Sequence, residues 1–148
     1  MLSLRGAGAD DVPLMAAWNV QLHEDEGSVP MTVPAAEDRL RQWLSGGAFH
    51  GMIFAVSSED VGYLLYEELP PDPALRGSQS ALYVRQFFIV RHKRRNGLGR
   101  AAFQRFLANH NTAGLPVVLD VKATNPAGHS FWTSLGFAAQ HTNYRIEV

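Results

Sequence analysis

The chain of 148 residues has no cysteine and no long apolar run, and each absence excludes classes of protein. Without cysteine there is no disulfide, no thiolate metal site and no cysteine nucleophile. No segment approaches the ~20 apolar residues that cross a bilayer as a helix. Residues 1–6 also lack the apolar core of a signal peptide. We therefore expect a cytoplasmic protein with no membrane contact.

The overall composition is that of an ordinary folded domain. Hydrophobic residues make up 46% of the chain and charged residues 18%. A chain of this length is enough for one hydrophobic core and too short for two, so we predict a single domain over residues 1–148. The net charge of -1 argues against a general nucleic-acid binder.

The distribution of charge tells more than its total. Acidic residues are absent from Pro73 to Leu119, and most of the cations lie there: Arg76, Arg85, Arg91, Lys93, Arg94, Arg95, Arg100 and Arg105. The acids lie mostly in the N-terminal half. A nearly neutral chain with one cationic segment is expected to bind a small polyanion rather than a long one.

The run Arg91–Arg100 lies between a strand-like segment, 81–90, and a segment with helical spacing of apolar residues, 98–107. Its glycines, Gly97 and Gly99, would let an anion approach the unpaired N–H groups at the start of the helix. The run is neither a Walker loop nor a dinucleotide fingerprint, because it has no Lys-Ser/Thr and no third glycine. A phosphate or pyrophosphate cradle is therefore predicted; the alternative is an ordinary turn with solvated cations.

The remaining patterns predict an α/β (α+β) fold with one mixed sheet flanked by about four helices. Strands are expected at 2–5, 49–56, 61–68, 81–90 and 116–121, and a terminal strand pair at 137–139 and 142–148. Helices are expected from Asp10 to about Glu26, from Pro34 to Leu44, from Leu98 to about Asn111, and from Ala127 to Leu135. Three prolines between Pro70 and Ser80 exclude regular structure there.

Two blocks in this order resemble the GNAT family of acyl-coenzyme-A-dependent N-acyltransferases. Arg94, Gly97 and Gly99 match that family's Arg/Gln-x-x-Gly-x-Gly/Ala signature. About thirty residues later, Asn125 and the run Phe131–Phe137 match its second element, an asparagine followed by a short helix that ends in an aromatic pair, three residues and Gly-Phe. The resemblance implies a mostly antiparallel, twisted sheet of six to seven strands.

The resemblance also implies that acetyl-coenzyme A is the acyl donor and that no metal is needed. The pantetheine arm would pair, as an extra strand does, with the main chain of Phe87, Phe88 and Ile89. Pyrophosphate would lie on the turn, and Trp132 stands where many members have tyrosine. The implied coenzyme-binding residues are Phe87, Phe88, Ile89, Arg94, Arg95, Asn96, Gly97, Leu98, Gly99, Arg100, Asn125 and Trp132.

The implied reaction is direct attack of a primary amine on the thioester. An ammonium with a pKa near ~10 must first lose a proton. The acids Glu24, Asp25 and Glu26 suggest a small cationic acceptor, with Glu26 as the general base and Gln86 lining the acceptor site. Trp132 cannot act as the family's tyrosine acid, so Tyr144 is a candidate acid, with His129 as another.

Two alternatives remain open at this point. A non-catalytic sensor that binds acyl-coenzyme A would explain the tryptophan at the acid position and the lack of a carboxylate on the central strand. A nucleic-acid module that uses the cationic run is disfavoured, because no stacking surface extends beyond Phe87 and Phe88. The expected partner is a small-molecule amine, with no nucleic acid and no membrane, and a homodimer is left open.

Overall fold

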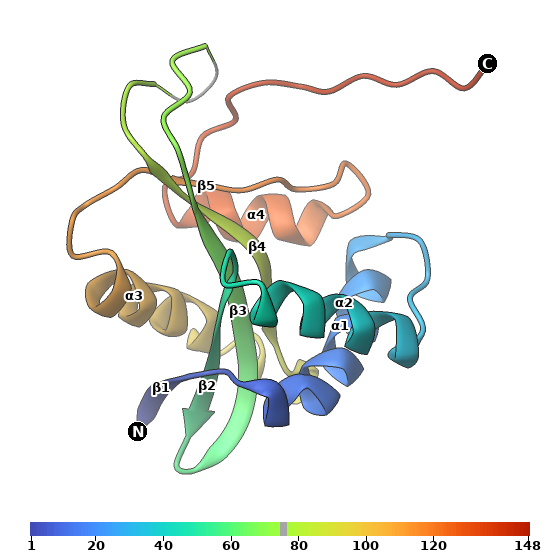
Figure 1. Cartoon of the computed structure of the whole chain (residues 1–148), viewed down its shortest axis with the longest axis vertical. Coiled ribbons are helices and arrows are strands. Elements are labelled where there is room, and N and C mark those ends of the chain that lie inside the picture. Colours follow the sequence, from blue (N-terminus) through green and yellow to red (C-terminus); the bar gives the residue numbers. More distant parts are fainter. Residues whose placement is uncertain (75–76) are drawn as a thin grey trace.

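The computed structural model describes residues 1–74 and 77–148, which form one sheet with helices on both faces (Figure 1). Two single-turn 3-10 helices, Ala9–Asp11 and Arg91–Lys93, adjoin the longer elements. Those are β1 (Leu2–Gly6), α1 (Val12–Glu26), α2 (Val33–Ser45), β2 (His50–Val56), β3 (Glu59–Leu69), β4 (Ala81–Ile89), α3 (Leu98–His110), β5 (Val117–Val118) and α4 (Pro126–Ser134).

The sheet has the strand order β1-β2-β3-β4-β5, antiparallel except where β5 runs parallel to β4. Successive residues of β4 contact helices on opposite faces, as the period of two in a strand requires. Phe88 packs against Trp18 of α1, whereas Phe87 packs against Phe103 of α3 and Phe131 of α4. The predicted mixed, mostly antiparallel sheet with four helices is confirmed.

Local sequence signals account for the element ends. Thr32 accepts a hydrogen bond from the backbone N–H of Ala35 and so caps α2, and Asn125 caps α4 by accepting from Gly128. Gly27 ends α1 in the left-handed conformation that favours glycine (φ 65°). Ser57 and Ser58 both have positive φ, as a two-residue hairpin turn between β2 and β3 requires.

The core lies where β3 and β4 are covered on both faces. Tyr63, Leu64, Leu65 and Phe88 are almost completely buried, and each large side chain removed from water contributes about 1.5–3 kcal/mol to stability. The central strands therefore form the rigid frame on which the site is built.

The C-terminal part differs from prediction. The described residues form five strands rather than six or seven, and 137–139 and 142–148 are not strands. The segment after α4 is extended and runs away from the sheet (Figure 1), and Tyr144 and Ile146 are 91% and 82% exposed. The cause lies in β5, which the apolar run from Pro116 to Val121 predicted to be longer. β5 covers only two residues and so offers almost no backbone hydrogen-bonding edge to which a further strand could pair.

Two further predictions concern the proline-rich segment and membrane-spanning helices. Between Pro70 and Ser80 the described residues hold only an isolated bridge between Asp72 and Gly77, and residues 75–76 lie outside the description. Among residues 1–74 and 77–148, no helix combines the length and apolarity that spanning a bilayer demands.

Candidate active site

The site begins at the edge of β4. This strand pairs with β3 along its whole length, from Ala81 opposite Leu69 to Ile89 opposite Gly62. On its other side, pairing with β5 is limited to Leu82 and Tyr83. Beyond Tyr83, that edge has no strand partner among the described residues. An extended chain of amides could therefore pair there as an additional strand.

The open edge leads into the cationic turn. Gly97 is the residue before α3 and has φ 83°, where glycine is favoured, and a Cβ built on it would have nothing within 4 Å. Leu98 donates its N–H to Asn96 Oδ1 at 3.3 Å. The next N–H groups, of Gly99 and Arg100, lie in the first helical turn and have no intrahelical acceptor. Unpaired N–H groups at the positive end of a helix are suited to an anion.

The second glycine of the turn has a different role. A Cβ on Gly99 would lie 3.2 Å from Phe131 Cε1, so glycine allows α3 and α4 to pack closely. Arg100 reinforces this contact by donating to the backbone oxygen of Ser134 at 2.9 Å. An open pocket of ≈ 310 Å³ adjoins the turn and is lined by Val56, Lys93, Asn96, Gly97, Leu98 and Ala101.

The arginines of the turn contact the end of α1. Arg94 donates from Nε to the Ile89 backbone oxygen and from Nη2 to Asp25 Oδ2, both at 2.7 Å. Arg91 Nη2 lies 3.0 Å from both Glu24 Oε1 and Asp25 Oδ1. Two of the three acids predicted to attract the acceptor are therefore paired with arginines of the turn, and only Glu26 remains unpaired.

Glu26 is half-buried at the end of α1, and its carboxylate makes no hydrogen bond or ion pair with any described residue. Burial raises the pKa of Glu26, and the nearby Lys122 opposes this shift. The backbone oxygen of Glu26 accepts a hydrogen bond from Thr124 Oγ1 at 2.7 Å, which joins α1 to the loop before α4. A carboxylate with a raised pKa is a better proton acceptor near neutral pH than an ordinary one.

A buried chain of hydrogen bonds connects α1, α2 and the sheet beside Glu26. Tyr63 donates to Gln86 Oε1 at 2.8 Å and accepts from Asn19 Nδ2 at 3.2 Å. Arg39 Nη2 donates to Asn19 Oδ1 and to His23 Nε2, each at 3.1 Å. Burial raises the pKa of Tyr63, so its hydroxyl stays protonated and keeps its donor role.

The backbone of β4 bulges at this point. Leu65 pairs with Gln86 and Tyr66 pairs with Val84, which leaves Arg85 without a partner on β3. Gln86 contacts Tyr63, which stacks on Trp18 of α1, while Arg85 lies over Trp43 of α2. The bulge therefore directs two consecutive side chains to the same face, which regular alternation forbids.

Comparison with known proteins identifies this arrangement. The sequence profile of the acetyltransferase (GNAT) family matches residues 16–137, which include the end of α1, β4, the turn and α4. The chain belongs to the GNAT acetyltransferase family. It is an acetyltransferase by that membership, and no curated protein sequence matches it.

Solved structures share the GNAT fold over the whole chain at low identity. A mutant of the BH1408 protein from Bacillus halodurans has a TM-score of 0.81 and 18% identity, covering 99% of both chains. A ribosomal-protein-alanine N-acetyltransferase from Brucella melitensis has a TM-score of 0.77 and 15% identity, and the match covers 100% of both chains. A predicted acetyltransferase with acetyl-CoA from Clostridium acetobutylicum has a TM-score of 0.72 and 16% identity, and the match covers 100% of this chain and 96% of the other.

Within this GNAT domain, the side chains of α4 hold the helix in place. Trp132 packs edge-on against Phe87 and Phe103, at centroid distances of 5.4 and 5.2 Å, and also contacts Phe131 and Phe137. Asn125 uses Oδ1 to cap the helix, while its Nδ2 donates to no described residue. The indole belongs to an aromatic cluster that fixes α4 against β4 and α3.

The candidate acids are not gathered with the other residues. Tyr144 is 91% exposed in the extended segment, and its ring and hydroxyl contact none of the predicted site residues within the described parts of the chain. His129 is exposed on α4. By contrast, the end of α1 contacts both other parts of the site: Glu26 is hydrogen-bonded to Thr124, next to Asn125, and Asp25 is paired with Arg94 of the turn. Gln86 is joined to α1 through Tyr63 and Asn19.

Sequence reasoning missed Asn19, Arg39, Tyr63 and Arg85. One signal was available: Asn19 lies between Met15 and Leu22 on the buried stripe of α1, so a polar side chain is turned towards the core. No sequence signal marks the bulge that directs Arg85 towards α2.

Proposed function

We propose that this GNAT domain transfers an acetyl group from acetyl-coenzyme A to the primary amine of a small acceptor by direct attack. The free edge of β4, leading into a helix start with unpaired N–H groups, carries the proposal. It suits a ligand that has amides at one end and a pyrophosphate at the other. The acceptor arrives as a cationic ammonium, and no metal has a part in the step.

The donor would use mainly backbone groups of this chain. The pyrophosphate would accept from the N–H groups of Gly99 and Arg100, above the uncovered Gly97. The pantetheine amides would pair with the main chain from Phe87 to Ile89, and Asn125 Nδ2 would donate to a pantetheine oxygen. The shape of the pyrophosphate cradle would come from the remaining turn residues, Arg94, Arg95, Asn96 and Leu98. Trp132 would keep α4 packed beside it.

Glu26 is the proposed base, acting directly or through one water. The acceptor ammonium, with a pKa near ~10, must lose a proton before it can attack. Glu26 is the unpaired acid of its helix end, and burial raises its pKa towards the range useful for a base. The oxyanion formed by attack would accept from a backbone N–H of β4 around Phe88, which is fixed before reaction.

The leaving thiolate needs little help. A thiol pKa of ~8.5 makes the thiolate a tolerable leaving group at neutral pH. Trp132 cannot donate a proton to sulfur, and the position of Tyr144 gives no support to its assignment as the acid. We therefore assign no residue as general acid, and protonation of sulfur by solvent follows.

The proposal is tested by mixing the purified protein with acetyl-coenzyme A and a panel of amines and measuring free thiol. Turnover with at least one primary amine is expected. Coenzyme-dependent stabilisation without turnover across the panel would instead favour a non-catalytic sensor.

The base is tested with Glu26→Gln, with Glu37→Gln on α2 as the matched control. Removing a general base lowers the rate about 10²-fold or more at pH 7, and the loss should shrink towards pH 10 as the amine deprotonates by itself. Glu37→Gln should keep the wild-type rate, because Glu37 is paired with Arg41 away from the site. An equal loss at every pH would exclude Glu26 as the base.

A further inference from the structure

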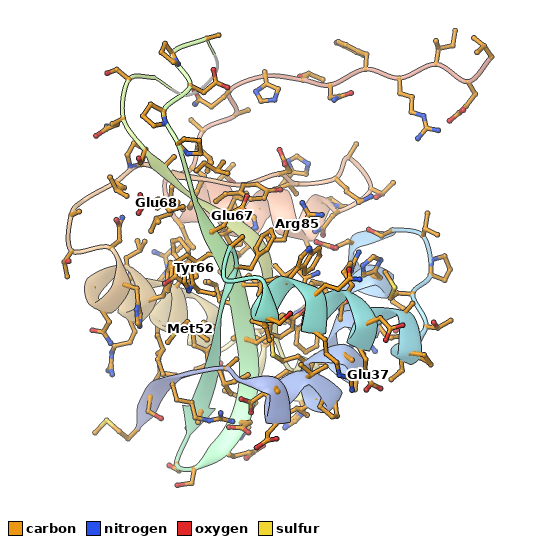
Figure 2. All side chains as sticks on the ribbon, in the orientation of Figure 1. Glu37, Met52, Tyr66, Glu67, Glu68 and Arg85 are labelled. Carbon is orange, nitrogen blue, oxygen red and sulfur yellow. The ribbon has the colours of Figure 1, made fainter. Side chains whose placement is uncertain are left out.

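Two arginines meet on one tryptophan beside the acceptor side of the site. The guanidinium carbon of Arg39 lies 4.7 Å from the centre of the Trp43 ring, and that of Arg85 lies 5.0 Å from it. Arg39 comes from α2, whereas Arg85 is the bulged residue of β4, and Figure 2 shows Arg85 beside α2. Two like charges are thus held against the same tryptophan ring by different elements.

Neither guanidinium has an ion pair with a described carboxylate. Among the described residues, Arg39 donates hydrogen bonds to Asn19 and His23 only, and its buried Nε has no hydrogen-bond partner. Glu26 acts on Arg39 electrostatically without forming an ion pair. A partly buried cation without a counterion is unfavourable, and its proximity to a second cation adds repulsion. Consistent with this, burial and Arg85 lower the pKa of Arg39.

The surroundings of Arg85 supply no counterion either. Arg85 acts electrostatically on the Tyr83 hydroxyl, which donates to Asp120 Oδ2 at 2.8 Å. Among the described residues, neither Asp120 nor Glu67 on β3 forms an ion pair with Arg85. A bound anion would offset the repulsion between the arginines. Guanidinium groups bind carboxylate and phosphate oxygens through paired N–H donors.

We propose that Arg39 and Arg85, which both contact the Trp43 ring, bind an anionic group of the acceptor. The acceptor is then an amine that also carries a carboxylate or phosphate, rather than a polyamine or another polycation. This inference rests on the proposed acetyl transfer, because Glu26 would receive the amine at the other side of the same site. Arg39 hydrogen-bonds to Asn19 and His23 of α1, the helix that ends at Glu26, so the two groups lie on neighbouring parts of the fold.

The test compares amines that differ only in the anionic group. Amino acids are assayed beside their carboxamides, aminoalkyl phosphates beside the corresponding amino alcohols, and spermidine represents the polycations. We expect kcat/KM to be at least about tenfold higher for the anionic member of a productive pair, the effect of one charge-assisted contact. A preference for carboxylate pairs or for phosphate pairs identifies which anion the site takes.

Arg85→Gln identifies the residue responsible. It should raise the KM for the anionic acceptor about tenfold. The KM for the matching carboxamide or alcohol and the KM for acetyl-coenzyme A should stay unchanged. Arg41→Gln is the matched control, since Arg41 lies on α2, loses the same charge and is paired with Glu37. Neutral or polycationic acceptors that equal the anionic ones, or a preference that persists in Arg85→Gln, would overturn the inference.

A binding measurement separates this inference from the proposed function. If no amine is acetylated, N-acetyl amino acids and their carboxamides are titrated into the coenzyme-A-loaded protein by calorimetry. Tighter binding of the carboxylates in the wild type, lost in Arg85→Gln, would uphold the anion site although the transfer proposal fails. Equal binding of both series would refute the anion site.

Discussion

Tyr63→Phe tests the buried network that positions the acceptor side of the site. The substitution keeps the ring, which stacks on Trp18 at a centroid distance of 6.1 Å, and removes only the hydroxyl. That hydroxyl holds Asn19 Nδ2 on one side and Gln86 Oε1 on the other, both in buried residues. Phenylalanine therefore leaves one donor and one acceptor buried without their partner.

The expected cost follows from those two groups. Each buried polar group left unsatisfied costs about 1–3 kcal/mol, so the loss of both partners should lower the free energy of unfolding by about 2–6 kcal/mol. For a chain of this length, 1 kcal/mol corresponds to about 2–4 °C, which predicts a decrease in Tm of roughly 4–24 °C. Acceptor KM should also rise, since Asn19 holds Arg39 through the same network.

The assay is urea and thermal unfolding of Tyr63→Phe beside Tyr66→Phe. Tyr66 lies on the same strand and packs against Phe106, but its hydroxyl bonds to no described residue. The control should stay within about 2 °C of wild type, since no hydrogen bond is lost. Equal Tm values for the two variants would refute the reasoning that the Tyr63 hydroxyl is the centre of the network.

Three further changes follow from the same geometry. Glu26→Gln should raise Tm at neutral pH, because burial raises the pKa of Glu26 in the folded protein and so disfavours its charged form. The increase in Tm should vanish below the ordinary pKa of 4.5, and an increase that stays constant down to that pH would contradict the reasoning. Gly97→Val should weaken coenzyme A binding, measured by calorimetry, and lower stability by about 1–2 kcal/mol because φ is 83°; unchanged affinity in the folded variant would exclude the turn as the pyrophosphate site. Gly62→Ala should prevent stable folding, measured by circular dichroism, because its Cβ would lie 2.1 Å from the backbone oxygen of Phe88; a variant as stable as the wild type would refute that packing.

The turn and the strand and helices around it could be predicted from sequence because their determinants are local. A strand pattern, two glycines and a helix period within about twenty residues specify β4, the turn and α3. The Asn-Pro pair at Asn125 likewise predicts the start of α4, and the structure confirms its cap. Backbone cradles depend on chain conformation more than on distant side chains, so short motifs describe them well.

The residues of the proposed acceptor side depend on long-range pairing, so they were harder to predict from the sequence. The pairing of Glu24 and Asp25 with Arg91 and Arg94 joins residues almost 70 positions apart. The bulge at Arg85 depends on the register between β3 and β4, which an alternation pattern does not encode. The terminal segment shows the opposite error, since 142–148 was expected to form a strand but pairs with no strand among the described residues.

The ion pairs between the turn and α1 predict that the two substrates bind cooperatively. Asp25 and Glu24 neutralise Arg94 and Arg91. If the coenzyme binds this turn as proposed, its diphosphate competes for these guanidinium groups and frees carboxylate charge at the helix end that carries Glu26. Donor binding would then make the neighbouring space more attractive to an ammonium, and thermodynamic reciprocity requires the amine to tighten donor binding equally. The expected signature is an apparent KM for each substrate that falls as the concentration of the other rises.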